Sequence, residues 1–320
     1  MSRPMQPVAR RFGVAVLLGL AALVAIAAAA LFPMWREAGQ RGGQTSAEPF
    51  RIAGNFYYVG ASDVASFLLT GPQGHVLIDG GYPGTPPLIM ASIAALGFDI
   101  RDVNVLLSTE PHYDHAGGLA ELQNASGAEL WASADSADAI ASGGDDAGTN
   151  FLPMRASVWI GLTRYAAARV GHRVSDGATI RLGPIVVTAH ITGGHTSGCT
   201  SWSFPVREGD RTLNVVSACD LGMLPGMRLV EPERYPGIRA DFEHSFRVLR
   251  SLPEDIWVTS HARTFGRYRK FLERANANNP ADPFIDRDGY LHYIDSAEER
   301  FRKALADQER NPSWITGWIP

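Results

Sequence analysis

The sequence contains few cysteines and few charged residues. Only two of its 320 residues are cysteine, which excludes a disulfide-rich scaffold and a zinc module built from cysteines. Charged residues make up 19% and hydrophobic residues 45%, a balance that excludes a disordered chain. The net charge of −4 gives no reason to expect a nucleic-acid partner. The chain is therefore expected to fold, as one large or two ordinary domains.

Motifs of a protein nucleophile are also missing. There is no Gly-x-Ser-x-Gly pentapeptide, and neither cysteine lies beside a histidine in a recognisable catalytic motif. What the sequence does contain is 33 glycines and 20 prolines, which favour a turn-rich α/β or β architecture over a helical bundle.

The first 34 residues have the pattern of an export signal. Arg3, Arg10 and Arg11 precede an apolar run over residues 13–34, as in a secretory signal peptide. Since roughly 18 apolar residues can span a bilayer, an uncleaved membrane anchor is the alternative. Either interpretation predicts an exported, periplasmic protein that contacts the membrane only through this leader. Residues 35–47 are interpreted as a linker and residues 48–320 as one domain.

Strand and helix patterns alternate along this domain. The pattern predicts strands at 56–59, 66–70, 75–79, 103–107, 128–131, 185–189 and 256–258, and a hairpin over 200–218. It predicts helices at 87–96, 118–126, 241–252 and 295–308, the last with Asp295 and Glu298 as a capping box. This mixture predicts an α/β fold of two mixed sheets packed together, with helices outside.

The densest chemical signal directly follows an apolar strand. Residues 108–118 read Ser-Thr-Glu-Pro-His-Tyr-Asp-His-Ala-Gly-Gly. Alternate side chains of an extended loop point the same way, so Glu110, His112 and Asp114 can converge, with His115 at the turn into the helix. Imidazole and carboxylate groups both suit Zn²⁺. Six residues cannot enclose two metals, so further ligands must come from elsewhere.

Two further histidines lie in loops at strand ends, where sites are often built. His195 lies in a glycine-lined turn, and His261 directly follows a predicted strand. Beside the cluster at 110–115, both are predicted to be metal ligands. The remaining histidines of residues 48–320 lack such neighbours and are expected to be structural or on the surface: His75, His172, His190, His244 and His292.

The segment from Glu110 to Gly118 resembles the His-x-His-x-Asp-His signature of the metallo-β-lactamase superfamily. The stretches 74–81 and 194–202 are similar to subclass B3 in particular. The resemblance implies an αββα four-layer sandwich, an exported monomer and two Zn²⁺ ions per monomer. The implied ligands are Glu110, His112 and His195 for the first zinc, and Asp114, His115 and His261 for the second.

One position departs from the signature, because Glu110 stands where the family has its first histidine. The anionic carboxylate strengthens cation binding by Coulomb attraction. It also partly neutralises the ion, so that water is acidified less. The alternative is that Glu110 turns away and the first metal is weakly held or missing.

The resemblance implies a zinc-dependent β-lactamase that confers antibiotic resistance. Such an enzyme opens the amide bond of penicillins, cephalosporins and carbapenems with a metal-bound hydroxide. Asp114 is then both a ligand and the catalytic residue that orients the nucleophile. Asp79 and Asp220 are expected behind the ligands, with a plain turn cap as the alternative for Asp79 and a metal-bridging role as the alternative for Asp220.

Substrate binding is predicted from fewer signals. Leu221 and Met223 occupy positions where many B3 enzymes have serines that hold the substrate carboxylate. Thr196, Arg228 and Trp159 are therefore the predicted substrate-binding residues. Trp159 belongs to a candidate apolar flap over 150–165, for which ordinary core packing is the alternative.

The two cysteines flank the predicted hairpin. Pairing symmetric about Gly209 would set Cys199 opposite Cys219, at a distance that a small twist could bring into disulfide range. The exported location favours oxidation, so a disulfide is predicted. Two buried thiols are the alternative, because a one-residue slip would point one sulfur to the other face of the sheet.

Two other functions remain open. A hydrolase of the same fold acting on lactones or thioesters would share the metal motif. A catalytically silent protein that binds a metal or ligand is the alternative suggested by Glu110.

Overall fold

The computed structural model describes residues 19, 43, 45–146, 152–224 and 226–311. Apart from Gly19, the predicted leader lies outside these residues. The chain divides into two compact units, Met1–Gly42 and Gly43–Pro320, and the second is described below. Within the described residues, no helix is both long enough and apolar enough to cross a membrane.

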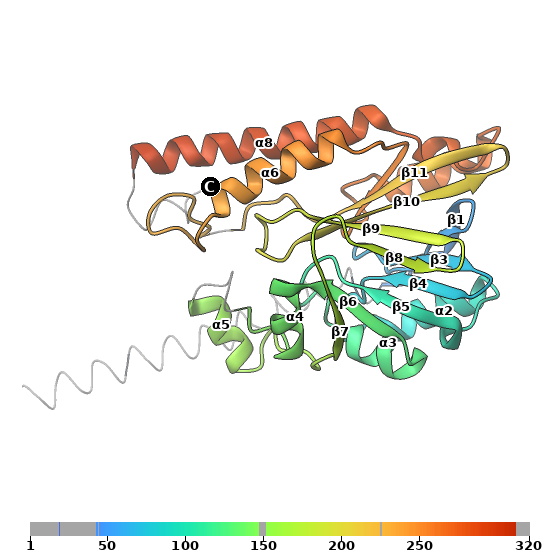
Figure 1. Ribbon diagram of the computed structural model, residues 1–320, viewed down its shortest axis with the longest axis horizontal. Helices are drawn as coiled ribbons and strands as arrows, with labels where there is room; N and C mark the ends of the chain where they lie inside the picture. Colours follow the sequence, from blue (N-terminus) through green and yellow to red (C-terminus); the bar gives the residue numbers. More distant parts are fainter. Residues whose placement is uncertain (1–18, 20–42, 44, 147–151, 225, 312–320) are drawn as a thin grey trace, which may run out of the picture. The chain divides into compact units, whose positions relative to one another are not determined.

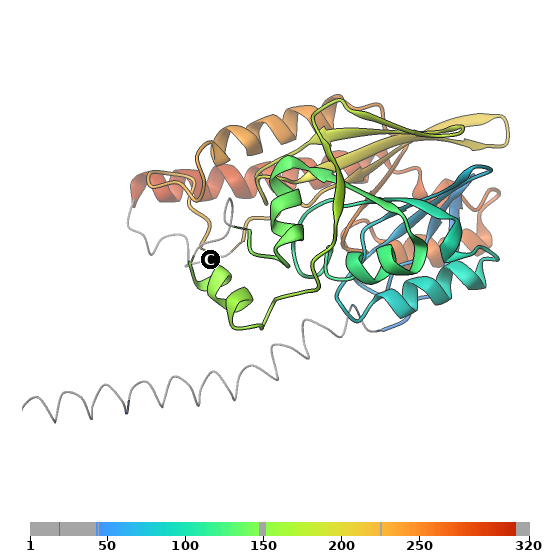
Figure 2. The same ribbon diagram turned by 60° about the horizontal axis from the view of Figure 1, so that its bottom comes forward.

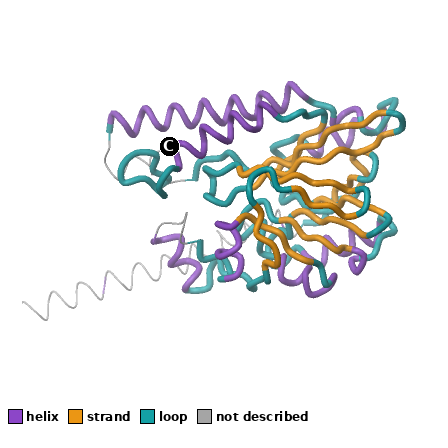
Figure 3. Tube along the Cα trace, in the orientation of Figure 1, coloured by secondary structure: helices purple, strands orange, loops and turns teal. Residues whose placement is uncertain are grey.

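Two β-sheets form the centre of this unit (Figures 1 and 3). The first sheet has seven strands in chain order: β1 (Phe50–Ala53), β2 (Phe56–Tyr58), β3 (Phe67–Gly71), β4 (Gly74–Ile78), β5 (Val103–Leu107), β6 (Glu129–Ser133) and β7 (Val170–Val174). Its first four strands pair antiparallel, and the pairs from β4 to β7 are parallel. The second sheet has the order β12 (Ile256–Thr259), β11 (Arg211–Ala218), β10 (Thr200–Glu208), β9 (Ile185–Ile191), β8 (Thr179–Leu182), parallel only between β11 and β12.

Helices cover the outer face of each sheet (Figures 1 and 2). The first sheet carries α2 (Pro86–Ala95), α3 (Leu119–Ser126) and α4 (Ala134–Ala141), and the second carries α6 (Ile238–Ser251) and α8 (Arg287–Arg310). Two shorter helices, α5 (Leu152–Trp159) and α7 (Arg267–Glu273), lie in the connections. The layers therefore run helix, sheet, sheet, helix, which is the predicted αββα sandwich.

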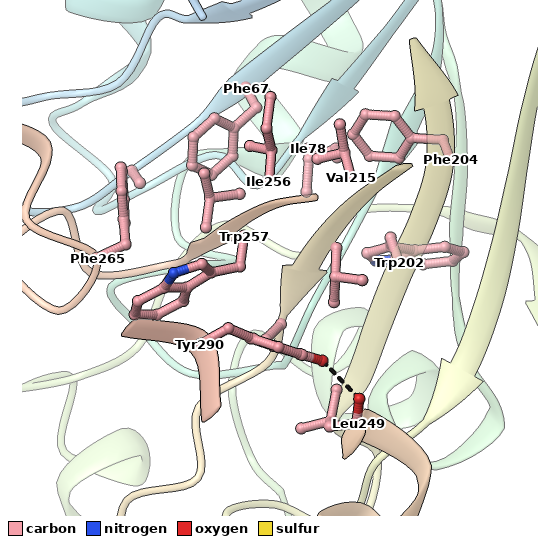
Figure 4. Packing of buried hydrophobic residues seen from close by; sticks show 14 of the residues in the cluster. Phe67, Ile78, Trp202, Phe204, Val215, Leu249, Ile256, Trp257, Phe265 and Tyr290 are labelled. Carbon is pink, nitrogen blue, oxygen red and sulfur yellow. Dashed lines mark hydrogen bonds between the residues drawn. The ribbon is translucent and has the colours of Figure 1, made fainter. Parts of the chain in front are cut away.

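Alternation along the strands builds two separate cores. Phe67 and Ile78 of the first sheet belong to the same cluster as Phe204 and Val215 of the second (Figure 4). The intervening residues of the first sheet, such as Leu77, pack in another cluster with the apolar residues of α2 and α3. The strands of the first sheet are thus covered on both faces, which explains their nearly continuous apolar runs.

The last helix begins earlier than the sequence pattern predicts. Helix α8 starts after Asp286, whose carboxylate accepts a hydrogen bond from Gly289 N at 3.0 Å. The predicted capping box is wrong, because Asp295 and Glu298 lie inside the helix. Both pair instead with Arg250 of α6, each at 2.6 Å. Two acidic residues three positions apart occur inside helices as well as at their starts, so this spacing alone does not identify where a helix begins.

The hairpin register also differs from the prediction by one residue. Strands β10 and β11 pair Trp202 with Ser217 and Glu208 with Arg211, so the turn is Gly209–Asp210. The disulfide between Cys199 and Cys219 nevertheless forms, with a Cα–Cα distance of 5.9 Å. Both cysteines lie just beyond the strand ends, where the ladder no longer fixes the side-chain direction.

Candidate metal centre

Each predicted ligand lies in a loop that follows a strand. The loop after β5 carries Glu110, His112, Asp114 and His115, and the loop after β9 carries His195. The sixth, His261, follows β12. Loops at strand ends can carry functional side chains without disturbing the sheet beneath them. The structure brings the six side chains together as two groups of three.

The first group contains Glu110, His112 and His195. The Oε2 atom of Glu110 lies 2.5 Å from Nδ1 of His112 and 3.3 Å from Nε2 of His195. Glu110 is fully buried, and its carboxylate points toward these imidazoles rather than away from them. The other ring nitrogen of His195, Nδ1, lies 2.6 Å from the carbonyl oxygen of Gly222. This contact fixes the ring orientation and leaves Nε2 to face the carboxylate.

The second group contains Asp114, His115 and His261. The Oδ2 atom of Asp114 lies 3.4 Å from Nε2 of His115 and 3.7 Å from Nε2 of His261. His115 is buried, whereas the side chains of His261 and Asp114 are 20% and 25% exposed. The second group therefore lies nearer the surface. A distance of 3.7 Å between His115 Nε2 and Glu110 Oε1 connects it to the first.

The donor atoms fit divalent metal ions. Two ligand atoms about 2.1 Å from a tetrahedral zinc ion lie about 3.4 Å apart, close to most of the distances within the two groups. Nitrogen and carboxylate oxygen are the donors that zinc accepts. Among the described residues, no lysine or arginine forms an ion pair with Glu110 or Asp114, so imidazoles alone face these carboxylates. Metal cations would supply the missing positive charge.

The pKa shifts in the first group also indicate a site that attracts cations. Burial raises the pKa of Glu110, but His195, His112 and His115 outweigh it and hold that pKa well below its usual value. Burial lowers the pKa of His195, but Glu110 and Asp220 raise it to about 10. The carboxylates thus create a negative potential that holds a proton on His195 when no metal is bound. A metal must displace such protons, so its affinity should fall at low pH.

Asp79 joins two of the ligand-bearing loops. Its carboxylate accepts hydrogen bonds from Thr109 N at 2.8 Å, Thr109 Oγ1 at 2.7 Å and Ser260 Oγ at 3.1 Å. These two partners directly precede Glu110 and His261 in the chain. Asp79 therefore does more than cap a turn, since one buried carboxylate ties a ligand of each group to the other.

Asp220 belongs to neither group of three among the described residues. Its Oδ1 accepts a hydrogen bond from Gly222 N at 2.8 Å, the residue whose carbonyl holds His195. Its charge raises the pKa of both His195 and His115. Asp220 thus contacts the loop that positions His195, and its supporting and bridging roles both stay predictions.

The three predicted substrate-binding residues have different surroundings. Thr196 is fully buried. The guanidinium of Arg228 donates to the carbonyls of Glu231 at 2.8 Å and Pro232 at 3.1 Å. Trp159 is 53% exposed and donates from Nε1 to Asp145 at 2.9 Å. Part of the predicted flap, including Phe151, lies outside the described residues. The substrate contacts of all three stay predictions.

Three residues that support the site were not predicted from the sequence. Thr109 and Ser260 are neighbours of predicted ligands, so their position in the chain was an available signal. Tyr293 of α8 was not detectable in this way. Its hydroxyl accepts a hydrogen bond from Leu221 N at 3.1 Å and lies 3.5 Å from the carbonyl oxygen of Cys219. Only the packing of α8 against the second sheet brings it there.

Comparisons with known proteins agree with this geometry. The family model described as the metallo-beta-lactamase superfamily matches residues 59–261. The Rm3 metallo-β-lactamase is 36% identical, with a TM-score of 0.77 over 84% of this chain and 97% of that one. MEM-A1, a subclass B3 metallo-β-lactamase from a soil metagenome library, is 32% identical, with a TM-score of 0.73 over 83% of this chain and 98% of that one. A curated relative, the hydroxyacylglutathione hydrolase of Jannaschia sp. (strain CCS1), is 26% identical over 218 residues, covering 68% of this chain and 69% of its own.

Proposed function

Because this chain belongs to the metallo-β-lactamase superfamily of hydrolases, we propose that it is a zinc-dependent β-lactamase of subclass B3. The observation that carries the proposal is the pair of three-donor groups, in a chain that matches solved β-lactamases over nearly their whole length. The proposed substrates are penicillins, cephalosporins and carbapenems.

In the proposed chemistry, each group of three donors binds one metal ion. Glu110, His112 and His195 would hold one zinc ion, and Asp114, His115 and His261 would hold the other. Bound zinc supplies Lewis acidity, which acidifies water and polarises a carbonyl oxygen. Asp114 directs Oδ2 toward His115 and His261. Its Oδ1 then accepts a hydrogen bond from the attacking water and aligns it with the β-lactam carbonyl.

The positions of the histidines are set by their other contacts. His195 is held through Nδ1 by the Gly222 carbonyl, so its ring does not need to reorient when the substrate enters. Asp79 fixes the loops of Glu110 and His261 together. Pre-organisation of this kind lowers the cost of reaching the transition state.

A thioester hydrolase is the second candidate, because the curated relative is named for hydrolysing hydroxyacylglutathione. That relative is less similar to this chain than the solved β-lactamases are. The resemblance of the stretch around His195 to subclass B3 also favours the lactamase.

Turnover by purified protein separates the candidates. Zinc-loaded and chelator-treated chains are assayed with a chromogenic cephalosporin, a penicillin, a carbapenem, a lactone and a glutathione thioester. We expect zinc-dependent β-lactam hydrolysis that exceeds thioester hydrolysis in kcat/KM. Thioester turnover alone would replace the proposal with the second candidate. Zinc binding without any turnover would support a silent metal-binding protein. The Asp114→Asn variant serves as the control for turnover by a contaminating enzyme.

A further inference from the structure

One oxygen of the Glu110 carboxylate lies near the disulfide as well as near a histidine. Its Oε2 atom faces His112 and His195, whereas Oε1 lies 3.7 Å from Nε2 of His115 and 4.0 Å from Sγ of Cys219. Glu110, Cys199 and Cys219 are all fully buried. The disulfide thus lies directly behind the metal loop, on the interior side of Glu110.

Each of the two sulfur atoms lies near a backbone carbonyl oxygen. Sγ of Cys219 lies 3.3 Å from the carbonyl oxygen of Thr109, and Sγ of Cys199 lies 3.6 Å from that of Asp220. One oxygen of Glu110 and the two sulfur atoms all lie within 4.8 Å of one another. Bonded to each other, the sulfurs are poor ligands, because the thiolate is the form that binds metals.

We propose that the Cys199–Cys219 disulfide masks a third cation site, formed by Glu110, Cys199 and Cys219 in the reduced chain. A dithiol reductant transfers two electrons and two protons, so that the S–S bond breaks, two thiols form and the reductant becomes a cyclic disulfide. A thiophilic divalent cation such as Zn²⁺, Co²⁺ or Cd²⁺ then displaces the two thiol protons and binds two thiolates and one carboxylate oxygen.

This site would compete with the first histidine group, because Glu110 belongs to both. In the oxidised chain, the disulfide sulfurs do not bind a metal, so Glu110 is a donor only beside the histidines His112, His195 and His115. In the reduced chain, a cation held by the two thiolates draws on the same carboxylate, so the first group binds its metal more weakly. The disulfide therefore keeps soft donors away from the metal centre as well as joining two loops.

Cobalt titration of the full chain tests the site without measuring turnover. A phosphine is the reductant, because a dithiol would itself bind cobalt. The phosphine takes the oxygen of one water molecule and becomes a phosphine oxide, and the two protons of that water end on the sulfurs. Thiol titration verifies two free thiols, and circular dichroism verifies the fold. We expect an intense thiolate-to-cobalt charge-transfer absorption in the reduced chain and none in the oxidised chain.

Two variants assign the donors. The double variant Cys199→Ser/Cys219→Ser, treated with the same phosphine, should show no charge-transfer absorption. Glu110→Gln should retain the absorption but bind cobalt about tenfold more weakly or worse at this site.

Three results would overturn the proposal. The first is a folded chain with two free thiols and no charge-transfer absorption. The second is absorption of unchanged affinity in Glu110→Gln. The third is loss of the fold on reduction, since the site requires a folded reduced chain. None of these results bears on β-lactam turnover by the oxidised chain, so the two proposals fail separately.

Discussion

At the scale of single residues, Glu110 shows how a carboxylate can stand in place of a histidine. It is fully buried, and three imidazoles lie within 3.7 Å of its oxygens. A buried carboxylate without positive partners would be costly, so protonated histidines or a cation would stabilise it. The same histidines hold its pKa well below the usual value, which keeps the carboxylate ionised and able to bind a cation.

Replacing Glu110 should disturb the first group selectively. Glu110→Ala leaves His112 and His195 as the only donors of that group, so the zinc content should fall from two ions per chain toward one. We expect kcat/KM for a cephalosporin to fall by about two orders of magnitude or more. Glu110→His is the matched variant and should keep both zinc and turnover. Unchanged zinc content and kcat/KM in Glu110→Ala would exclude Glu110 as a ligand.

Asp79 should affect metal binding without touching the metal. Asp79→Asn replaces one of the two acceptor oxygens by an NH2 group, which cannot accept the hydrogen bonds that the Thr109 and Ser260 hydroxyls donate to Oδ2. Loss of such a supporting partner lowers zinc affinity by about 10- to 100-fold. Competition with a chromophoric chelator measures the change. Asp99→Asn, which alters a surface carboxylate paired with Arg101, is the control and should leave the affinity unchanged.

At the scale of elements, strongly apolar segments were predictable and weakly patterned ones were not. Strands β4 and β5 carry runs of buried Val, Leu and Ile and were predicted to within one residue. Strand β7, with three exposed residues among its five, and helix α4, rich in Ala and Asp, gave no clear period and were missed. Such elements are stabilised by pairing with neighbouring strands and by packing against other elements. The periodicity of the sequence does not reveal these contacts.

The two ends of α3 offer a test of why glycine follows the metal loop. A Cβ atom at Gly118 would lie 2.2 Å from the backbone oxygen of Gly80, whereas one at Gly127 would meet nothing within 4 Å. Gly127 has φ of 75°, so Gly127→Ala should cost about 1–2 kcal/mol through backbone strain alone.

Gly118→Ala should cost more, about 3 kcal/mol, because the backbone of the loop or of Gly80 must move. It should also weaken zinc binding, since the same loop carries four of the proposed ligands, whereas Gly127→Ala should not. Denaturant unfolding and chelator competition measure the two effects. Equal losses of stability with unchanged zinc affinity in both variants would contradict the close approach at Gly118.

At the scale of the whole molecule, the candidate ligands were easier to predict from the sequence than their arrangement into two groups. Four candidate ligands are neighbours in sequence, and chemistry alone singles them out. His195 and His261 follow strands of the second sheet, so no local pattern assigns either of them to a group. Only the resemblance implied the division into two groups. No local pattern shows that Asp79 of the first sheet meets Ser260 of the second. Contacts between sheets depend on the packing of the layers, which the sequence encodes only collectively.

The proposed location can be tested in a bacterial host. If residues 1–34 export the chain, the full sequence should raise resistance to β-lactams, which act outside the cytoplasm. Deletion of residues 1–34 should abolish that resistance while lysates keep the hydrolytic activity. Immunodetection in periplasmic, membrane and cytoplasmic fractions also separates a cleaved signal from a retained anchor. Full resistance from the shortened chain would contradict export by this segment.

The stability of the whole fold should depend on pH through Asp286. This carboxylate begins α8 and lies 2.7 Å from Nζ of Lys270, whose side chain is buried over the Trp257 ring. Burial raises the pKa of Asp286, but the contacts with Lys270 outweigh it and lower that pKa. The stabilisation is therefore fully present above the unfolded pKa of about 3.9 and disappears as the pH falls through the lower folded value.

Asp286→Asn should accordingly destabilise the chain most at neutral pH. Removing one partner of a buried pair leaves Lys270 charged and uncompensated, at a cost of about 3 kcal/mol. At pH 7 the variant should unfold at clearly lower denaturant concentration than the parent chain, and the gap should shrink as the pH falls below about 4. Loss of metal at low pH is common to both chains and cancels in the difference. Asp288→Asn, at an exposed position two residues later, is the control and should change stability by less than about 1 kcal/mol at either pH. A gap that stays constant between pH 7 and pH 3 would show that the Asp286 carboxylate does not stabilise the fold through its charge.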